Sequence, residues 1–137
     1  MAKLTKNLGT GSVLTIVILV VLGYVIYSTY NQQLKKFVNL KISAEQARNH
    51  RFGLIIDTRT PKERELLGFL PNSIPISINT LSKDVPLAIS NRNTWILVYS
   101  NGDNRAQMGA EQLYRMGYPN VRYIVQNYNA LMPGSRN

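Results

Sequence analysis

Six polar residues lie between an apolar run and a helical pattern, and they are the part of this sequence best suited to chemistry. The six are Ser100, Asn101, Gly102, Asp103, Asn104 and Arg105. The run at 95–98 predicts a strand and the pattern of 106–116 predicts a helix, so the six residues form a tight loop at a helix N-terminus. Such a terminus offers unpaired N–H groups and a dipole that favours an anion. The sequence therefore predicts an anion- or ligand-binding loop.

Ser100 opens this loop, at a position where a nucleophile would be well prepared. A serine hydroxyl becomes nucleophilic only beside a base. His50 is the one histidine and stands well apart in the sequence, while Asp103 would repel anionic substrates. Asn, Gly and Asp also tolerate tight turns, so a plain loop explains the same residues. The chain has no cysteine, which excludes thiolate chemistry, disulfides and cysteine metal sites. We predict no catalytic residue, no metal and no cofactor.

The charge of the chain is positive but spread out. It has 137 residues, with 16 Lys and Arg against 7 Asp and Glu, giving a net charge of +9. No dense basic tract and no motif that combines basic and aromatic residues is present, which argues against nucleic acid as a partner. A mildly basic surface beside a membrane favours anionic lipid head groups or an acidic partner.

The amino-terminal segment has the length and composition of a membrane span. No charged residue lies between Lys6 and Lys35, and residues 13–27 are almost continuously apolar. We predict a short tail at 1–11, a transmembrane helix at 12–30 in contact with the lipid bilayer, and a polar linker at 31–39 that could continue the helix. A cleaved signal peptide is the rival interpretation, but no small-residue cleavage site follows the apolar run. The prediction is a retained single-pass anchor.

The distribution of lysine and arginine around the span gives an orientation. Two lysines precede it, and four basic residues follow it within a short stretch: Lys35, Lys36, Lys41 and Arg48. Positive charge collects on the cytoplasmic side of membrane proteins, so we predict a cytoplasmic domain after the span.

Residues 40–132 alternate between short strands and helices, before a tail at 133–137. The predicted strands are 54–57, 73–76, 95–99 and 121–125, and the predicted helices are 43–48, 61–67 and 106–116, with a loose helix or turn segment interrupted by Pro86 at 81–90. His50 is predicted to be a surface residue that closes the first of these helices. Alternation of this kind indicates a three-layer α/β domain with a mainly parallel sheet.

Several blocks of this domain, in their order, resemble the rhodanese-like domain family. The blocks are Ile42–Gln46, Ile55–Glu63, Gly68–Ile76, Ser100–Arg105, Gly117–Val121 and Tyr128–Leu131. The resemblance implies the rhodanese-like three-layer fold, and it implies sulfurtransferases that carry sulfur as a cysteine persulfide. The six-residue loop has the sulfurtransferase length, whereas related phosphatases use a longer loop. The resemblance also implies that Arg105 takes part in loop geometry. The residues themselves favour a salt bridge from Arg105 to Asp57 or Asp103, and a supporting, structural role for Arg59.

The sequence departs from the family pattern at three landmarks. Ser100 stands at the cysteine position and is a degenerate nucleophile, Phe69 replaces a histidine, and Gln126-Asn127 replaces a Gly-Gly pair. Departures at functional positions in an otherwise matching sequence are typical of a domain that keeps the fold of its family but not its catalytic activity.

Three functions fit these observations. The first is a membrane-anchored, catalytically inactive rhodanese-like module that binds protein partners or is a structural subunit of a larger membrane-associated assembly, in a membrane complex or a membrane-containing virus particle. The alternative is a membrane-bound thiosulfate-type sulfurtransferase whose cysteine was exchanged for Ser100 by engineering. A serine-based hydrolase ranks last, because it lacks a base.

Overall fold

The computed structural model describes residues 10–36 and 38–134, without the side chains of Thr10 and residues 33–36. It divides into an amino-terminal unit that ends at Asn39 and a unit that begins at Leu40, called here the α/β unit. Most of the predicted tail at 1–11 and the last three residues of the tail at 133–137 lie outside the described residues.

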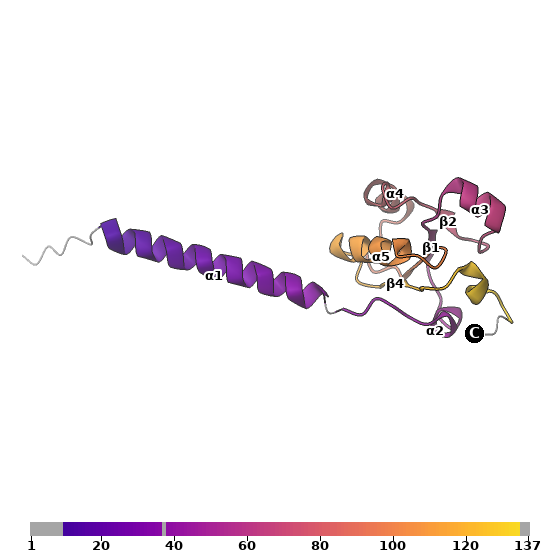
Figure 1. Ribbon diagram of the computed structural model, residues 1–137, viewed down its shortest axis with the longest axis horizontal. Coiled ribbons are helices and arrows are strands. Elements are labelled where there is room, and N and C mark those ends of the chain that lie inside the picture. Colours follow the sequence, from indigo (N-terminus) through magenta and orange to yellow (C-terminus); the bar gives the residue numbers. More distant parts are fainter. Residues whose placement is uncertain (1–9, 37, 135–137) are drawn as a thin grey trace, which may run out of the picture. The chain divides into compact units, whose positions relative to one another are not determined.

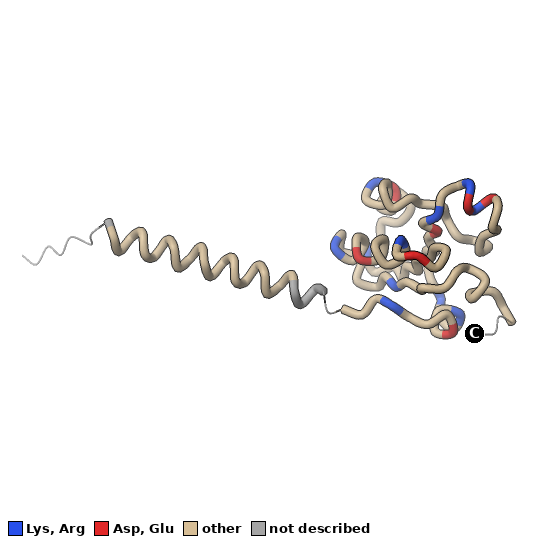
Figure 2. Tube along the Cα trace, in the orientation of Figure 1, with Lys and Arg blue, Asp and Glu red and all other residues tan. Residues whose placement is uncertain are grey.

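The amino-terminal unit is a single long helix, α1 (Thr10–Lys36) (Figure 1). It contains the predicted span at 12–30 and continues through residues 31–36 of the segment predicted as a linker. Gly11–Gln32 is long and apolar enough to cross a membrane, and none of its most apolar window is buried. Figure 2 shows no charged residue along this stretch. At 1.5 Å per residue its length is about 33 Å, against about 30 Å for the hydrocarbon core of a bilayer.

The α/β unit is built on four parallel strands in the order β2-β1-β3-β4. The strands are β1 (Leu54–Asp57), β2 (Ile74–Pro75), β3 (Ile96–Tyr99) and β4 (Val121–Tyr123). All four residues of β3 are buried, as expected for a central strand of a parallel sheet. Pro75 lies on the edge strand β2, where its missing N–H breaks no ladder. The strand predicted at 121–125 is shorter in the structure and ends at Tyr123.

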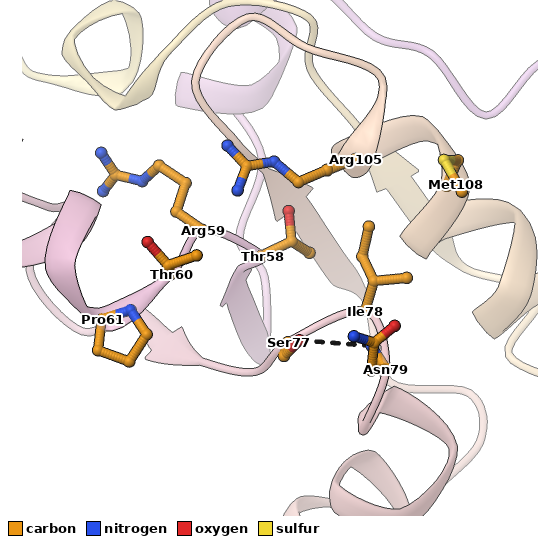
Figure 3. Close-up of a pocket in the computed structure, with 9 residues that line it drawn as sticks. All are labelled: Thr58, Arg59, Thr60, Pro61, Ser77, Ile78, Asn79, Arg105 and Met108. Carbon is orange, nitrogen blue, oxygen red and sulfur yellow. Dashed lines mark hydrogen bonds between the residues drawn. The ribbon is translucent and has the colours of Figure 1, made fainter.

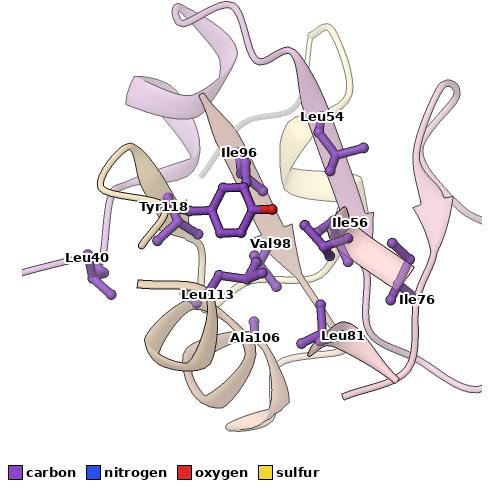
Figure 4. Close-up of a cluster of buried hydrophobic side chains, with 13 residues drawn as sticks. Leu40, Leu54, Ile56, Ile76, Leu81, Ile96, Val98, Ala106, Leu113 and Tyr118 are labelled. Carbon is purple, nitrogen blue, oxygen red and sulfur yellow. The ribbon is translucent and has the colours of Figure 1, made fainter. Parts of the chain in front are cut away.

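Helices cover both faces of this sheet, which confirms the three-layer α/β prediction. They are α2 (Ala44–Arg48), α3 (Pro61–Leu67), α4 (Leu81–Ala88), α5 (Arg105–Arg115) and the 3-10 helix η1 (Tyr128–Leu131). Core side chains from α4 and α5 pack on one face, and those from α2 and η1 pack on the other. Figure 4 shows the larger of the two clusters. Pro86 does not interrupt α4, because the N–H of Ile89 still donates to the Val85 carbonyl oxygen over 2.9 Å.

Helix α5 approaches the sheet closely, and this approach positions the loop that precedes it. Ala106, Gly109, Ala110 and Leu113 form its buried face, as the helical spacing predicts. A Cβ atom added at Gly109 would lie 3.3 Å from Leu81 Cδ1 and 3.4 Å from Val98 Cγ1. The small side chains therefore bring the N-terminus of α5 against the end of β3.

Candidate functional site

The loop at 100–105 lies at the carboxyl edge of the sheet, beside the point where the strand order reverses. From β1 the chain continues to β2 on one side, whereas from β3 it continues to β4 on the other. The loops that follow β1 and β3 therefore diverge, and ligands of open α/β sheets bind in crevices of this kind.

The carboxylate of Asp57, at the end of β1, is fully buried and organises this edge. Arg59 Nη2 and Nε donate to its two oxygens over 2.7 and 2.9 Å. Arg64 Nη1 donates to it over 3.2 Å, and Tyr99 Oη donates over 2.9 Å. The Tyr99 hydroxyl also lies 2.9 Å from Ser73 Oγ. The cluster therefore joins the ends of β1 and β3 to α3 and to the loop before β2.

The protonation states of this cluster follow from its contacts. Burial alone would raise the pKa of Asp57, but the hydrogen bonds from Arg59 and Tyr99 outweigh burial and lower it. The hydrogen bond to Asp57 raises the pKa of Arg59, and burial raises the pKa of Tyr99. The guanidinium of Arg59 also lies 5.5 Å from the ring centre of Tyr99 and 5.4 Å from that of Tyr128. Asp57 and Arg59 are thus a charged pair, and Tyr99 is a neutral donor.

Arg105 ties the loop to α3 through two carboxylates. Its guanidinium donates to Glu63 over 2.8 and 2.6 Å and to Asp103 over 2.8 and 2.6 Å. Glu63 is in turn held by Thr60, whose N–H and hydroxyl donate to Oε2 over 2.8 and 2.9 Å. Hydrogen bonds from Arg105 lower the pKa of both Glu63 and Asp103. Hydrogen bonds to Glu63 and Asp103 raise the pKa of Arg105. One cation is therefore shared by two carboxylates.

Ser100 is almost completely buried, at 1% exposure. Its Oγ forms no hydrogen bond within the described part of the chain. His50 packs on the ring of Trp95, with 4.3 Å between ring centres, at the start of β3. Five residues of extended chain separate Trp95 from Ser100, or roughly 17 Å. His50 is therefore too far from Ser100 to act as its base.

A pocket of about 360 Å³ opens beside the loop (Figure 3). Its lining consists of Thr58, Arg59, Thr60, Pro61, Ser77, Ile78, Asn79, Arg105 and Met108. Of the six loop residues only Arg105 reaches it. The other exposed loop residues, 101–104, lie outside the pocket lining.

The structure brings the predicted site residues together in two groups. Asp57 and Arg59 pair with each other, and the loop forms its own group around Arg105. The prediction of Asp103 as a partner of Arg105 is confirmed, and the prediction of Asp57 is wrong, because Arg59 and Arg64 occupy that carboxylate. Sequence reasoning missed Glu63 as the second partner.

Replacement of Asp57 by asparagine tests the buried cluster. Asp57→Asn leaves the buried guanidinium of Arg59 without its counter-charge, and we expect a loss of about 3 kcal/mol or more in the free energy of unfolding. Denaturant unfolding of the full chain in detergent, followed by Trp95 fluorescence, measures it. The exposed Glu65→Gln is the control, with an expected change within about 0.5 kcal/mol. Equal effects of the two changes would contradict the role of Asp57.

Replacement of Ser100 by alanine tests whether its hydroxyl has a partner. A buried hydroxyl without a hydrogen bond costs free energy, so Ser100→Ala should stabilise the chain by about 1 kcal/mol. The same unfolding measurement applies. A loss of stability would mean that the hydroxyl makes a favourable interaction in the folded protein.

The pH dependence of stability tests the link between Arg105 and Glu63. Because the folded-state pKa of Glu63 is lowered, its contribution is complete above the carboxyl pKa of the unfolded chain, about 4, and is lost as the pH falls through the lower folded value. We expect Glu63→Gln to lose less stability on acidification than the parent chain does. Unfolding curves recorded as the pH is lowered measure this, and identical acid-induced losses would refute the link.

Comparison of the sequence and structure with known proteins identifies the family and the fold. The rhodanese-like domain family matches residues 38–132. A single-domain sulfurtransferase from Saccharomyces cerevisiae is 20% identical with a TM-score of 0.53, over 69% of this chain and 89% of its own. A rhodanese-related protein from Thermoplasma volcanium is 24% identical with a TM-score of 0.55, over 66% and 88%. At these identities the structural likeness shows the fold alone.

A third solved structure has the same fold. It is a protein of unknown function from Rhodopseudomonas palustris, described as a possible tyrosine phosphatase, which is 20% identical with a TM-score of 0.60 over 72% of this chain and 83% of its own. No curated protein matches the chain. The family match covers more than half of the chain, and the chain therefore belongs to the rhodanese-like domain family.

Proposed function

We propose that this chain is a membrane-anchored, catalytically inactive rhodanese-like module that binds protein partners within a membrane-associated assembly. The observation that carries the proposal is the absence of a sulfur nucleophile from the loop at 100–105. The loop otherwise keeps the length and position of a rhodanese-like loop. The family resemblance predicts a cysteine at position 100, and serine cannot carry a persulfide.

The charges around the loop support the absence of sulfur transfer. Thiosulfate is a dianion, and a site for it needs free positive charge or free N–H donors. Arg105 is the cation of the loop, and Glu63 and Asp103 both bind it. The three groups together carry a net negative charge. The positive charge of Arg105 is therefore already compensated, which weakens its attraction for a dianion.

The exposed side of the same edge supports a binding role. Residues 101–104 are exposed and polar, and the pocket next to them combines apolar side chains such as Ile78 and Met108 with polar ones such as Asn79. The buried cluster around Asp57 holds the loops that present these groups. A mainly apolar pocket beside exposed polar residues suits recognition of a protein surface, because protein interfaces combine an apolar centre with a polar rim.

Helix α1 supports membrane anchoring. Its apolar side chains are exposed around the whole helix, so only a lipid or protein environment would remove them from water. The hydroxyls of Thr15 and Thr29 donate to the carbonyl oxygens of Gly11 and Val25 over 2.7 and 3.0 Å. Internal bonds of this kind satisfy polar groups in a bilayer. The excess of positive charge after the span favours a cytoplasmic α/β unit.

Restoration of the cysteine tests this function. We expect Ser100→Cys to show no transfer of sulfur from thiosulfate to cyanide above the uncatalysed rate, because Glu63 and Asp103 still neutralise Arg105. A triple variant that adds Glu63→Gln and Asp103→Asn frees the guanidinium and should react faster with thiosulfate than Ser100→Cys does.

Steady turnover by Ser100→Cys alone would contradict the expectation that Glu63 and Asp103 block sulfur transfer at this site. It would mean that the site is intact apart from one atom, and it would favour a membrane-bound sulfurtransferase whose cysteine was exchanged for serine. The unfolding midpoint of each variant, measured in the same detergent, shows that loss of folding does not explain an inactive result.

A further inference from the structure

We propose that the amino edge of the sheet, opposite the candidate site, docks the α/β unit onto anionic phospholipid head groups of the bilayer that holds α1. This inference rests on the membrane anchoring in the proposed function. It adds a lipid-binding surface and an orientation of the domain.

Four arginines gather at this edge because the strands are parallel and all begin there. Arg51 lies shortly before β1, Arg92 shortly before β3, Arg115 at the end of α5 and Arg122 within the first residues of β4. Arg92 donates to the Met116 carbonyl oxygen, which links the segment before β3 to the end of α5. The four side chains therefore share one end of the unit.

The cations of the two edges differ in their pairing. Arg59, Arg64 and Arg105, at the carboxyl edge, are bound to carboxylates. Within residues 10–36 and 38–134, none of the four arginines at the amino edge forms an ion pair. Three of them, Arg51, Arg92 and Arg115, are exposed to solvent.

Two further charged residues complete the surface. Lys41 is exposed and is placed beside β4 by its bridge to Tyr123. Glu111 lies one helical turn before Arg115, and its carboxylate accepts a hydrogen bond from Gln107. Among the described residues, this edge therefore carries the four arginines and Lys41 beside the carboxylate of Glu111, and this excess of positive charge suits an anionic surface.

Trp95 adds an interfacial aromatic side chain to these cations. It is the one tryptophan of the chain, it is 37% exposed, and it lies at the start of β3. The guanidinium of Arg122 lies 5.2 Å from its ring centre, and His50 packs against the same ring. Tryptophan next to basic residues is typical of surfaces at the level of lipid head groups.

The path of the chain identifies lipid as the occupant of this edge. Tyr123 N–H donates to Leu40 O, and Ile42 N–H donates to Tyr123 O, each over 3.0 Å, so residues 40–42 run parallel to β4. The chain therefore reaches the unit from its amino edge. Residues 33–39 alone separate the apolar stretch of α1, which ends at Gln32, from Leu40, and eight peptide steps span at most roughly 29 Å. A tether this short gives the bilayer a high effective concentration at this edge.

Fluorescence of Trp95 in the full chain tests the docking. The chain is reconstituted into vesicles of phosphatidylcholine alone or mixed with phosphatidylglycerol, each with brominated lipid as the quencher. We expect stronger quenching and a blue-shifted emission in the anionic vesicles, with loss of both at high salt because salt screens the attraction.

Charge variants distinguish the effect of the arginines at this edge from the effect of the net charge of the chain. Arg51→Gln with Arg115→Gln removes two cations that make no hydrogen bond or ion pair among the described residues, and each should lower the ratio of docked to undocked domain by roughly fivefold. The matched control is Lys62→Gln with Lys83→Gln, which removes the same charge from α3 and α4 and should leave the quenching unchanged.

The outcomes distinguish this inference from the anchoring on which it rests. Equal quenching in neutral and anionic vesicles, or equal effects of the two double variants, with the chain retained in the vesicles after an alkaline wash, would overturn the docking alone. Loss of the chain in the wash would overturn the anchor itself. Docking that is lost only in the arginine variant supports the proposal.

Discussion

The hydrogen bonds and ion pairs of the buried Asp57 carboxylate hold together the carboxyl edge of the sheet. A buried charge without partners costs several kcal/mol, so its donors must be supplied by the surrounding chain. They come from Arg59 in the next loop, from Arg64 on α3 and from Tyr99 at the end of β3. These donors to Asp57 connect the loop after β1, helix α3 and the end of β3, which lie beside the loop at 100–105. Ser100 is not one of the donors.

The two edges of the sheet carry positive charge in opposite ways. At the carboxyl edge the guanidinium groups are bound by carboxylates, and these ion pairs link the loops of that edge to one another. At the amino edge arginines remain available beside Trp95, next to the segment through which the chain arrives from α1. In the proposed arrangement the amino edge faces lipid, and the polar loops of the candidate site face away from the bilayer toward a partner.

Local patterns in the sequence predicted most of the fold, and long-range partners were harder to predict. The apolar runs before Asp57 and Ser100 and the small face of the helix after 105 are each determined by neighbours in sequence. The pairing of Arg105 with Glu63 joins residues 42 positions apart. Thr60 and Glu63 form a capping box at the start of α3, and only the packing of α3 beside the loop brings that carboxylate to Arg105. For the same reason, the sequence left Asp57 and Asp103 as alternative partners of Arg105, and the structure shows Asp103.

The central claim is that the α/β unit of this chain binds protein partners and does not catalyse sulfur transfer. Sulfur transfer from thiosulfate to cyanide by the unaltered full chain, reconstituted in a bilayer, tests it most directly. The account predicts a rate equal to that of protein-free vesicles. A rate above this background that disappears on Ser100→Ala would contradict it, because the serine would then be acting in the chemistry.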